Sequence, residues 1–268
     1  MPGFASNYRE GSMNTPAKIR IGLLSPATPN RPHFKSLEQM LPPEVSLIHE
    51  GLGLLQDSYH NLEGKTDEIT SRAADFVRRT KVEGLIITGG FVTLFNPDLE
   101  ATVAKSVHVP VTSAVSAVIA ALRAVSAKRL MLVTPFTADM NGVIEKHLTA
   151  REFTVFFGPS FDKNRRPGAG VDINPGELFH RVEEGYRQNP TSEAIYFQGA
   201  TLDPLPVIQK LEDKLGVAVI ASNPAMFWHI LSKLGWKFSI HGYGKLLSSW
   251  PGGNIESEYK SAIGRNSS

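Results

Sequence analysis

The chain has 268 residues, of which 41% are hydrophobic and none is cysteine, and its formal net charge is +2. This length is enough for one large or two modest hydrophobic cores. A net charge so close to zero gives no electrostatic reason to expect nucleic acid or an anionic membrane surface as a partner. The absence of cysteine excludes disulfides, thiolate nucleophiles and thiolate metal sites. No apolar run approaches the roughly 20 residues that span a bilayer and no signal peptide is recognisable, so we expect a cytoplasmic protein.

The first part of the folded chain is expected to be an α/β unit over residues 17–113. Residues 1–16 before it are polar and unpatterned, which predicts a disordered tail. Apolar runs predict strands over residues 19–24, 45–49 and 85–87 and a fourth strand just before residue 114. A helix with an inner apolar stripe is expected to begin at Thr66, interpreted as its cap, and to end near residue 81.

The second part, residues 114–223, repeats this plan. Strands are predicted over 129–134, 153–157, 194–197 and 217–221, and helices over 114–127, 139–148 and 175–187, with a further helix after Asp203-Pro204. A last helix is predicted over 224–234. Residues 224–247 could pack on the first half, and residues 248–268 are interpreted as a C-terminal tail.

Internal similarity between two stretches indicates a duplication. Residues 83–116 and 193–224 each read as a buried strand, a turn of small residues, a helix started by Asn-Pro or Asp-Pro, and a second buried strand. The first strand of each half also ends in a similar turn, Leu-Ser-Pro-Ala-Thr or Val-Thr-Pro-Phe-Thr. The predicted fold is therefore α/β, with two pseudo-twofold-related halves, each a four-stranded parallel sheet, and a site in the cleft between them.

Five separated segments carry a resemblance to a known family. They are Gly51-Leu52-Gly53-Leu54, Pro110-Val111-Thr112-Ser113, Leu122-Arg123-Ala124, the run from Ala221 to Trp228, and Gly242-Tyr243-Gly244-Lys245-Leu246. With these segments in order, the chain resembles the aspartate/glutamate racemase superfamily over about residues 18–247. Within it, the chain is most similar to the branch of arylmalonate decarboxylases and maleate cis-trans isomerases.

The resemblance implies chemistry without a cofactor at a carbon next to a carboxylate. In this family, backbone N–H groups and hydroxyls of the strand-end turns hold the carboxylate and stabilise an enolate-like intermediate. One or two cysteines, one per glycine turn, move the proton, whereas here the turns read Thr88-Gly89-Gly90-Phe91 and Phe197-Gln198-Gly199-Ala200. Decarboxylases of this branch also lack the first thiol, but racemases and isomerases normally need both. The tyrosine that decarboxylases place on the second Ser/Thr-Pro turn is Phe136 here, which removes one oxyanion donor.

Four residues are candidates for catalysis: Gln198, Gly199, Gly90 and His60. Alignment with the family leaves open whether Gln198 or Gly199 stands at the position of the missing cysteine. A glutamine amide can donate a hydrogen bond and orient a substrate, but it cannot shuttle a proton. His60 lies beside Tyr59 in a loop that overhangs the cleft in this family; it is either an acid or base or only a solvated loop histidine.

Eleven residues are candidates for substrate binding because they lie on the strand-end turns or beside them. They are Ser25, Pro26, Leu54, Gly89, Phe91, Thr93, Thr134, Phe136, Thr137, Ala200 and Asn223. The alternatives without a ligand are that the glycines allow close packing or adopt a positive φ, and that the Ser/Thr-Pro residues only end strands. Phe95 and Phe161 are further candidates for an apolar wall, and Tyr196 is expected in the core. The charged loop that carries Asp162, Lys163, Arg165 and Arg166 either grips a carboxylate or is solvated.

The leading functional hypothesis is a cofactor-independent lyase, decarboxylase-like, that acts on an activated carboxylic acid through an enolate-type intermediate without a thiol. The alternatives are a cofactor-free isomerase or a rearrangement or elimination enzyme for a larger metabolite, and, in another class, an inactive protein that binds a small acid. No cofactor is expected. The eight histidines form no His-x-His or His-x-x-x-His pair, so no metal site is predicted. The expected partner is a small carboxylic acid, and the oligomeric state is left open.

Overall fold

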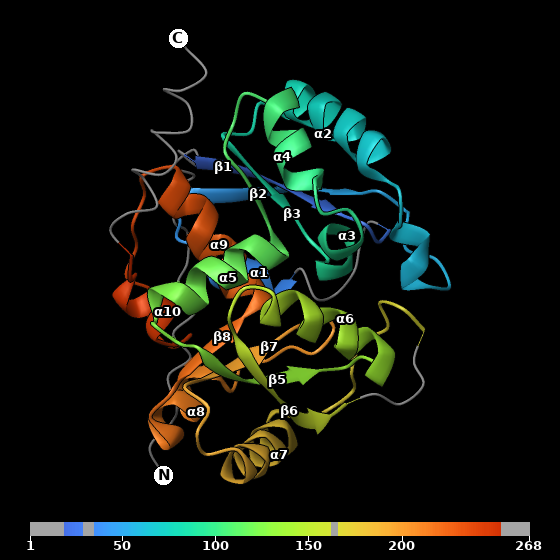
Figure 1. The fold of residues 1–268 in the computed structure, drawn as a ribbon. Helices are drawn as coiled ribbons and strands as arrows, with labels where there is room; N and C mark the ends of the chain where they lie inside the picture. The colour runs from blue at the N-terminus through green and yellow to red at the C-terminus, as the bar shows by residue number, and fades with distance from the viewer. Residues whose placement is uncertain (1–18, 29–34, 162–165, 253–268) are drawn as a thin grey trace, which may run out of the picture.

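The computed structural model describes residues 19–28, 35–161 and 166–252 (Figure 1). The predicted tail over 1–16 and the loop residues Asp162, Lys163 and Arg165 lie outside these ranges. No helix within them is long and apolar enough to cross a membrane.

The first sheet is parallel, with the strand order β2-β1-β3-β4. Its strands are short and mostly buried, as expected for a parallel sheet with both faces covered; they are β1 (Ile19–Ser25), β2 (Val45–Gly51), β3 (Gly84–Ile87) and β4 (Val111–Ser113). The segments between and after the strands form α1 (Lys35–Glu38), the 3-10 helix η2 (Tyr59–Leu62), α2 (Thr66–Thr80), α3 (Gly90–Phe95) and α4 (Leu99–Ser106).

The second sheet is also parallel and has the equivalent order β6-β5-β7-β8. Its strands are β5 (Arg129–Thr134), β6 (Thr154–Ser160), β7 (Ala194–Phe197) and β8 (Ala218–Ala221). The helices from β4 onward are α5 (Ala114–Ala124), α6 (Ala138–Thr149), α7 (Pro175–Gln188), α8 (Ile208–Leu215), α9 (Ser222–Lys233) and α10 (Lys245–Ser249). Two four-stranded parallel sheets with the same strand order confirm the predicted fold class.

Helices α5 and α9 lie between the two sheets, whereas α2 and α4 cover the outer side of the first sheet and α7 the outer side of the second (Figure 1). All residues of α9 from Ser222 to Ser232 are buried, as expected for a helix enclosed on all sides. Its His229 places Nδ1 2.7 Å from Oγ1 of Thr112 on β4, and burial lowers the pKa of His229 to about 3. A neutral imidazole thus joins α9 to the first sheet, although α9 follows the last strand of the second. The boundary between the halves at residue 113 stays a prediction.

Two helices begin later than their sequence signals indicate. Asn96-Pro97 precedes α4, which begins at Leu99, and Asp203-Pro204 precedes α8, which begins at Ile208. The Asp203 carboxylate accepts a hydrogen bond from the N–H of Leu205 at 3.2 Å, so it forms a local turn before the helix instead of capping it.

The side chain of Asn96 makes hydrogen bonds to residues that are distant in the sequence. Its amide Nδ2 donates to the carbonyl of Leu62 at 2.6 Å, and its Oδ1 accepts from the N–H of Lys65 at 2.8 Å. Lys65, and not Thr66, is the N-cap of α2, and its side chain makes no cap bond. The expected cap at Thr66 is therefore wrong, because Asn96 from another segment supplies the acceptor at this helix start.

The folded chain extends into the predicted C-terminal tail. Trp250 is only 6% exposed, and its indole N–H donates to Oγ of Ser232 on α9 at 2.9 Å. Trp250 therefore belongs to the core, because an indole that packs and bonds in this way is tied to the fold.

Candidate active site

The two Ser/Thr-Pro turns have the same local geometry after the equivalent strands β1 and β5. Oγ of Ser25 accepts the N–H of Ala27 at 3.2 Å, and Oγ1 of Thr134 accepts the N–H of Phe136 at 3.2 Å. Each hydroxyl thus stabilises its own turn, as serine and threonine commonly do two residues before an N–H. The structural repetition supports the duplication inferred from the sequence.

The glycine turns follow β3 and β7, and their glycines are not equivalent. Gly89 has φ +83° and Gly199 has φ +110°, a region that L residues rarely adopt. A Cβ on Gly199 would also lie 2.8 Å from Cζ of Phe136. Both glycines are therefore required by backbone conformation, whereas Gly90 does not have a positive φ and opens α3.

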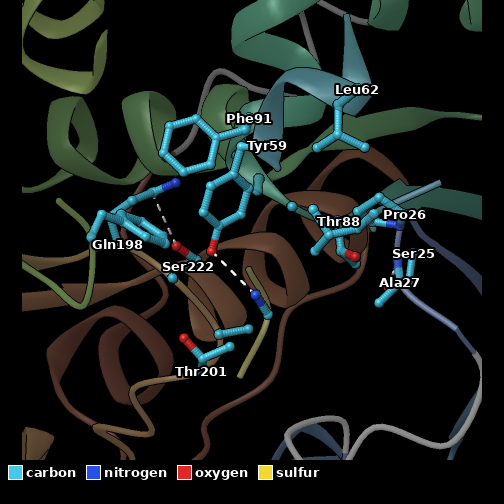
Figure 2. A pocket seen from close by; sticks show the side chains of 18 of the residues that line it. Ser25, Pro26, Ala27, Tyr59, Leu62, Thr88, Phe91, Gln198, Thr201 and Ser222 are labelled. Atoms are coloured by element: carbon cyan, nitrogen blue, oxygen red, sulfur yellow. Dashed lines mark hydrogen bonds between the residues drawn. The ribbon is translucent and has the colours of Figure 1, made fainter. Parts of the chain in front are cut away.

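The turns of both halves surround one small cavity (Figure 2). The space in it that the centre of a water molecule can reach has a volume of about 80 Å³. One water needs about 10–15 Å³ on this measure, so the cavity has room for a small ligand. Strand-end turns from both halves line this cavity, so it lies where the sequence predicted a cleft between the halves.

The side chain of Gln198 reaches from the second glycine turn to the first. It is 2% exposed, and its Nε2 lies 2.0 Å from the place where a Cβ on Gly90 would be. Its Oε1 accepts a hydrogen bond from Oγ of Ser222 at 3.3 Å (Figure 2). The backbone N–H of Gln198 donates to the carbonyl of Val133 at 3.0 Å. Of the two positions that the sequence left open, residue 198 is therefore the one whose side chain enters the cavity.

Free backbone donors belong to residues that line the cavity. In the part of the chain that the structure describes, the N–H groups of Gly90, Gly199 and Ala200 have no hydrogen-bond acceptor. Free N–H groups beside a cavity can bind a carboxylate or a developing oxyanion. The arrangement has the donors that an oxyanion hole requires.

Aromatic rings also line the cavity. The ring of Tyr59 lies 4.6 Å from that of Phe91 and 5.6 Å from that of Phe136, and the two phenylalanine rings are 4.9 Å apart between centroids. Contacts between aromatic edges and faces at these distances fix the rings. The hydroxyl of Tyr59 accepts a hydrogen bond from the N–H of Gly168 at 3.3 Å, which links the two halves across the cavity (Figure 2).

Ten of the predicted site residues line the cavity: Ser25, Pro26, Gly89, Gly90, Phe91, Phe136, Gln198, Gly199, Ala200 and Asn223. Sequence reasoning did not single out several other lining residues: Ala27, Leu55, Leu62, Thr88, Ala114, Gly168, Thr201, Ser222 and Met226. Ser222 directly follows β8, so the rule that ligands bind at the carboxyl ends of parallel strands would have found it.

Five predicted residues do not line the cavity: Leu54, His60, Thr93, Thr134 and Thr137. The side chain of His60 is 64% exposed, contacts the carboxylate of Glu63 and stacks on Phe95 at 5.1 Å, so it faces away from the cavity. Thr134 uses its hydroxyl within its turn, and Thr137 is the N-cap of α6.

The other predicted residues near the site also lie elsewhere. Phe161 is buried beneath the guanidinium of Arg181, 4.2 Å from the ring centroid. Arg166 is exposed and does not line the cavity, and Tyr196 is buried in β7, as expected. Within the described ranges no three His, Asp or Glu side chains are placed to hold a metal ion.

The fold and this site define a class of α/β proteins in which two equivalent four-stranded halves enclose one small-molecule cavity. The chain matches the arylmalonate decarboxylase family over residues 21–247. It is 27% identical to an arylmalonate decarboxylase from Bordetella bronchiseptica over 213 residues, which are 76% of this chain and 87% of the relative. It is also 27% identical over 140 residues to a maleate isomerase from Geobacillus stearothermophilus, covering 52% of this chain and 55% of the relative.

Solved structures show the same fold. A liganded double mutant of arylmalonate decarboxylase has a TM-score of 0.76 at 22% identity, covering 86% of this chain and 99% of that one. A maleate cis-trans isomerase from Nocardia farcinica, a mutant with a covalent succinylcysteine intermediate, has a TM-score of 0.74 at 20% identity, covering 86% and 98%. The chain belongs to the arylmalonate decarboxylase family. This confirms the predicted family and enzyme class, a decarboxylase or isomerase, in a chain without cysteine.

Proposed function

We propose that this protein is a cofactor-independent decarboxylase for a small malonate-type acid, and that the reaction passes through an enolate-type intermediate. The observation that carries the proposal is a cavity lined by both free backbone donors and aromatic rings. The N–H groups of Gly90, Gly199 and Ala200 are unpaired, and the rings of Tyr59 and Phe91 line the same cavity.

The donors and the rings have different roles in the proposed reaction. The carboxylate that stays on the substrate is held by the N–H groups, and the carboxylate that leaves is placed beside the aromatic rings. Charge on the leaving carboxylate is poorly solvated there, which favours its loss as neutral carbon dioxide. The electron pair of the broken C–C bond moves into the retained carboxylate, and the N–H groups stabilise the resulting enediolate.

We place Gln198 at the position of the family's missing thiol, because its side chain reaches the cavity. Its amide is anchored by Ser222 and extends to Gly90, so its Nε2 adds a donor near the first glycine turn. A glutamine cannot transfer a proton, which favours decarboxylation over reactions that need two acid–base groups. A small carboxylic acid as partner and a cytoplasmic location are parts of the same proposal.

The proposal is tested by incubating the purified protein with arylmalonates, maleate and aspartate. We expect carbon dioxide from at least one arylmalonate, measured by gas release and by NMR of the monocarboxylic product. Conversion of maleate to fumarate would instead support the isomerase alternative, which the maleate isomerase relatives favour. Calorimetric binding of an acid without any turnover would identify an inactive acid-binding protein.

Racemisation of amino acids is not expected. Two-base racemisation needs an acid and a base on opposite faces of the α-carbon, and no Asp, Glu, Lys, Arg or His among the described residues lines the cavity. L-Aspartate or L-glutamate incubated with the protein in deuterated water should therefore yield neither D-isomer nor α-deuterium above a protein-free control. An enzyme-dependent appearance of D-isomer, measured by chiral chromatography, would contradict this expectation.

A further inference from the structure

A decarboxylase without a thiol still needs a proton donor. When carbon dioxide leaves, the α-carbon of the enediolate must gain a proton before the product can be released. The cavity offers hydroxyls of serine and threonine, the amides of Gln198 and Asn223, and one phenol. Among the described residues that line it, Tyr59 carries the only side chain that acts as a Brønsted acid in water.

Tyr59 is held in place from three directions. It is the first residue of η2, whose N-cap Ser58 forms a capping box with Asn61. Its ring is packed against Phe91 at 4.6 Å and Phe136 at 5.6 Å. These contacts come from both halves of the protein, so the phenol is positioned before any substrate binds.

A hydrogen bond fixes the position of the phenolic oxygen. The N–H of Gly168 donates to Oη of Tyr59 at 3.3 Å. Together with the ring contacts, this bond holds the hydroxyl group at the wall of the cavity.

We infer that Tyr59 is the catalytic acid of this site and protonates the α-carbon after decarboxylation, an inference that rests on the proposed function. The O–H bond of the phenol breaks, and its proton forms the new C–H bond with the electron pair that the departing carbon dioxide left in the enediolate. The phenolate of Tyr59 then takes a proton from water, so one proton enters for each carbon dioxide released. His60, the sequence candidate for this role, is directed away from the cavity.

Tyr59→Phe tests the inference, because it removes the acidic proton and keeps the ring. We expect kcat to fall about a hundred- to ten-thousandfold, as for loss of a general acid, with a smaller change in KM. With an α-methyl-α-arylmalonate the wild type should release one enantiomer of the product. The residual product of Tyr59→Phe should be racemic, because water reaches both faces of the enediolate.

The matched control is Tyr243→Phe. The hydroxyl of Tyr243 donates to the carbonyl of Gln39 at 3.3 Å, and Tyr243 does not line the cavity, so rate and enantiomeric excess should stay at the wild-type values. If Tyr59→Phe does not fold, as judged by thermal melting, Tyr59→His places another acid there, and a single enantiomer from it is the expected result.

Three outcomes would overturn the inference. If Tyr59→Phe keeps the wild-type rate, another donor serves the reaction, and the proposed function survives without Tyr59. If the rate falls but one enantiomer is still formed, or if a folded Tyr59→His yields racemic product, Tyr59 has a structural role only. If the wild type releases no carbon dioxide from any arylmalonate, the proposed function and the assignment of Tyr59 both fail.

Discussion

Gly90→Val is expected to lower turnover about a hundred- to a thousandfold while the protein stays folded. The range corresponds to about 2.7–4 kcal/mol, typical for the loss of one oxyanion-hole donor. A Cβ at position 90 would lie 2.0 Å from Nε2 of Gln198, the far end of a flexible side chain, so the amide must move out of its place. The backbone is not strained, because Gly90 does not have a positive φ. Steady-state kinetics and thermal melting measure the two effects separately.

Two other glycines provide controls for Gly90→Val. Gly142→Val should leave turnover unchanged, because nothing lies within 4 Å of a Cβ at that position on α6. Gly199→Val should lower the melting temperature by many degrees, since φ of +110° and the contact with Phe136 strain any side chain there. If Gly90→Val lowers the melting temperature as far as Gly199→Val does, Gly90 serves the fold and not the site.

A double variant locates the origin of the Gly90 effect. If added volume at residue 90 acts only by displacing the amide, Gly90→Ala in a Gln198→Ala background should have the activity of Gln198→Ala alone. Residues in contact show such non-additivity in a double-mutant cycle. A further loss in the double variant would instead assign part of the effect to the N–H of Gly90 itself.

Gln198→Cys is expected to create an exchange activity that the parent protein has only weakly or not at all. Residue 198 is the position from which a side chain reaches the cavity, and a thiol there can take and return a proton where a glutamine amide cannot. The variant should introduce deuterium at the α-carbon of a small arylacetate in deuterated water, at a rate above that of the parent. Mass spectrometry of the recovered acid measures the uptake.

The absence of any native cysteine makes this experiment specific. Iodoacetamide alkylates a thiolate much faster than other side chains, so a stoichiometric amount should abolish the gained exchange in Gln198→Cys and leave the parent unaffected. Gly199→Cys is the matched comparison, and it should gain little because its Cβ would meet Phe136 at 2.8 Å. Deuterium uptake equal to that of the parent in a folded Gln198→Cys protein would show that this cavity no longer supports family chemistry.

The fold, the family and the turns around the cavity could all be predicted from the amino-acid sequence. Buried parallel strands read as short apolar runs, and each of the eight expected strands is present, two of them with the predicted boundaries and the others with small shifts. The glycine and Ser/Thr-Pro turns lie at the strand ends, where both halves contribute to the cavity. These features were accessible because they depend on residues close together in the chain, through hydrophobic pattern and turn chemistry.

Which side chains face the cavity could be seen only in the folded molecule. His60 and Tyr59 are neighbours in one loop, yet His60 turns to Glu63 and Phe95, whereas Tyr59 packs on Phe136 and binds Gly168 from the other half.

The choice between Gln198 and Gly199 likewise depended on a contact between Gln198 and Gly90, far away in sequence. The orientation of a loop side chain depends on contacts with residues that are distant in the sequence and come together only on folding. Local sequence patterns therefore do not predict this orientation.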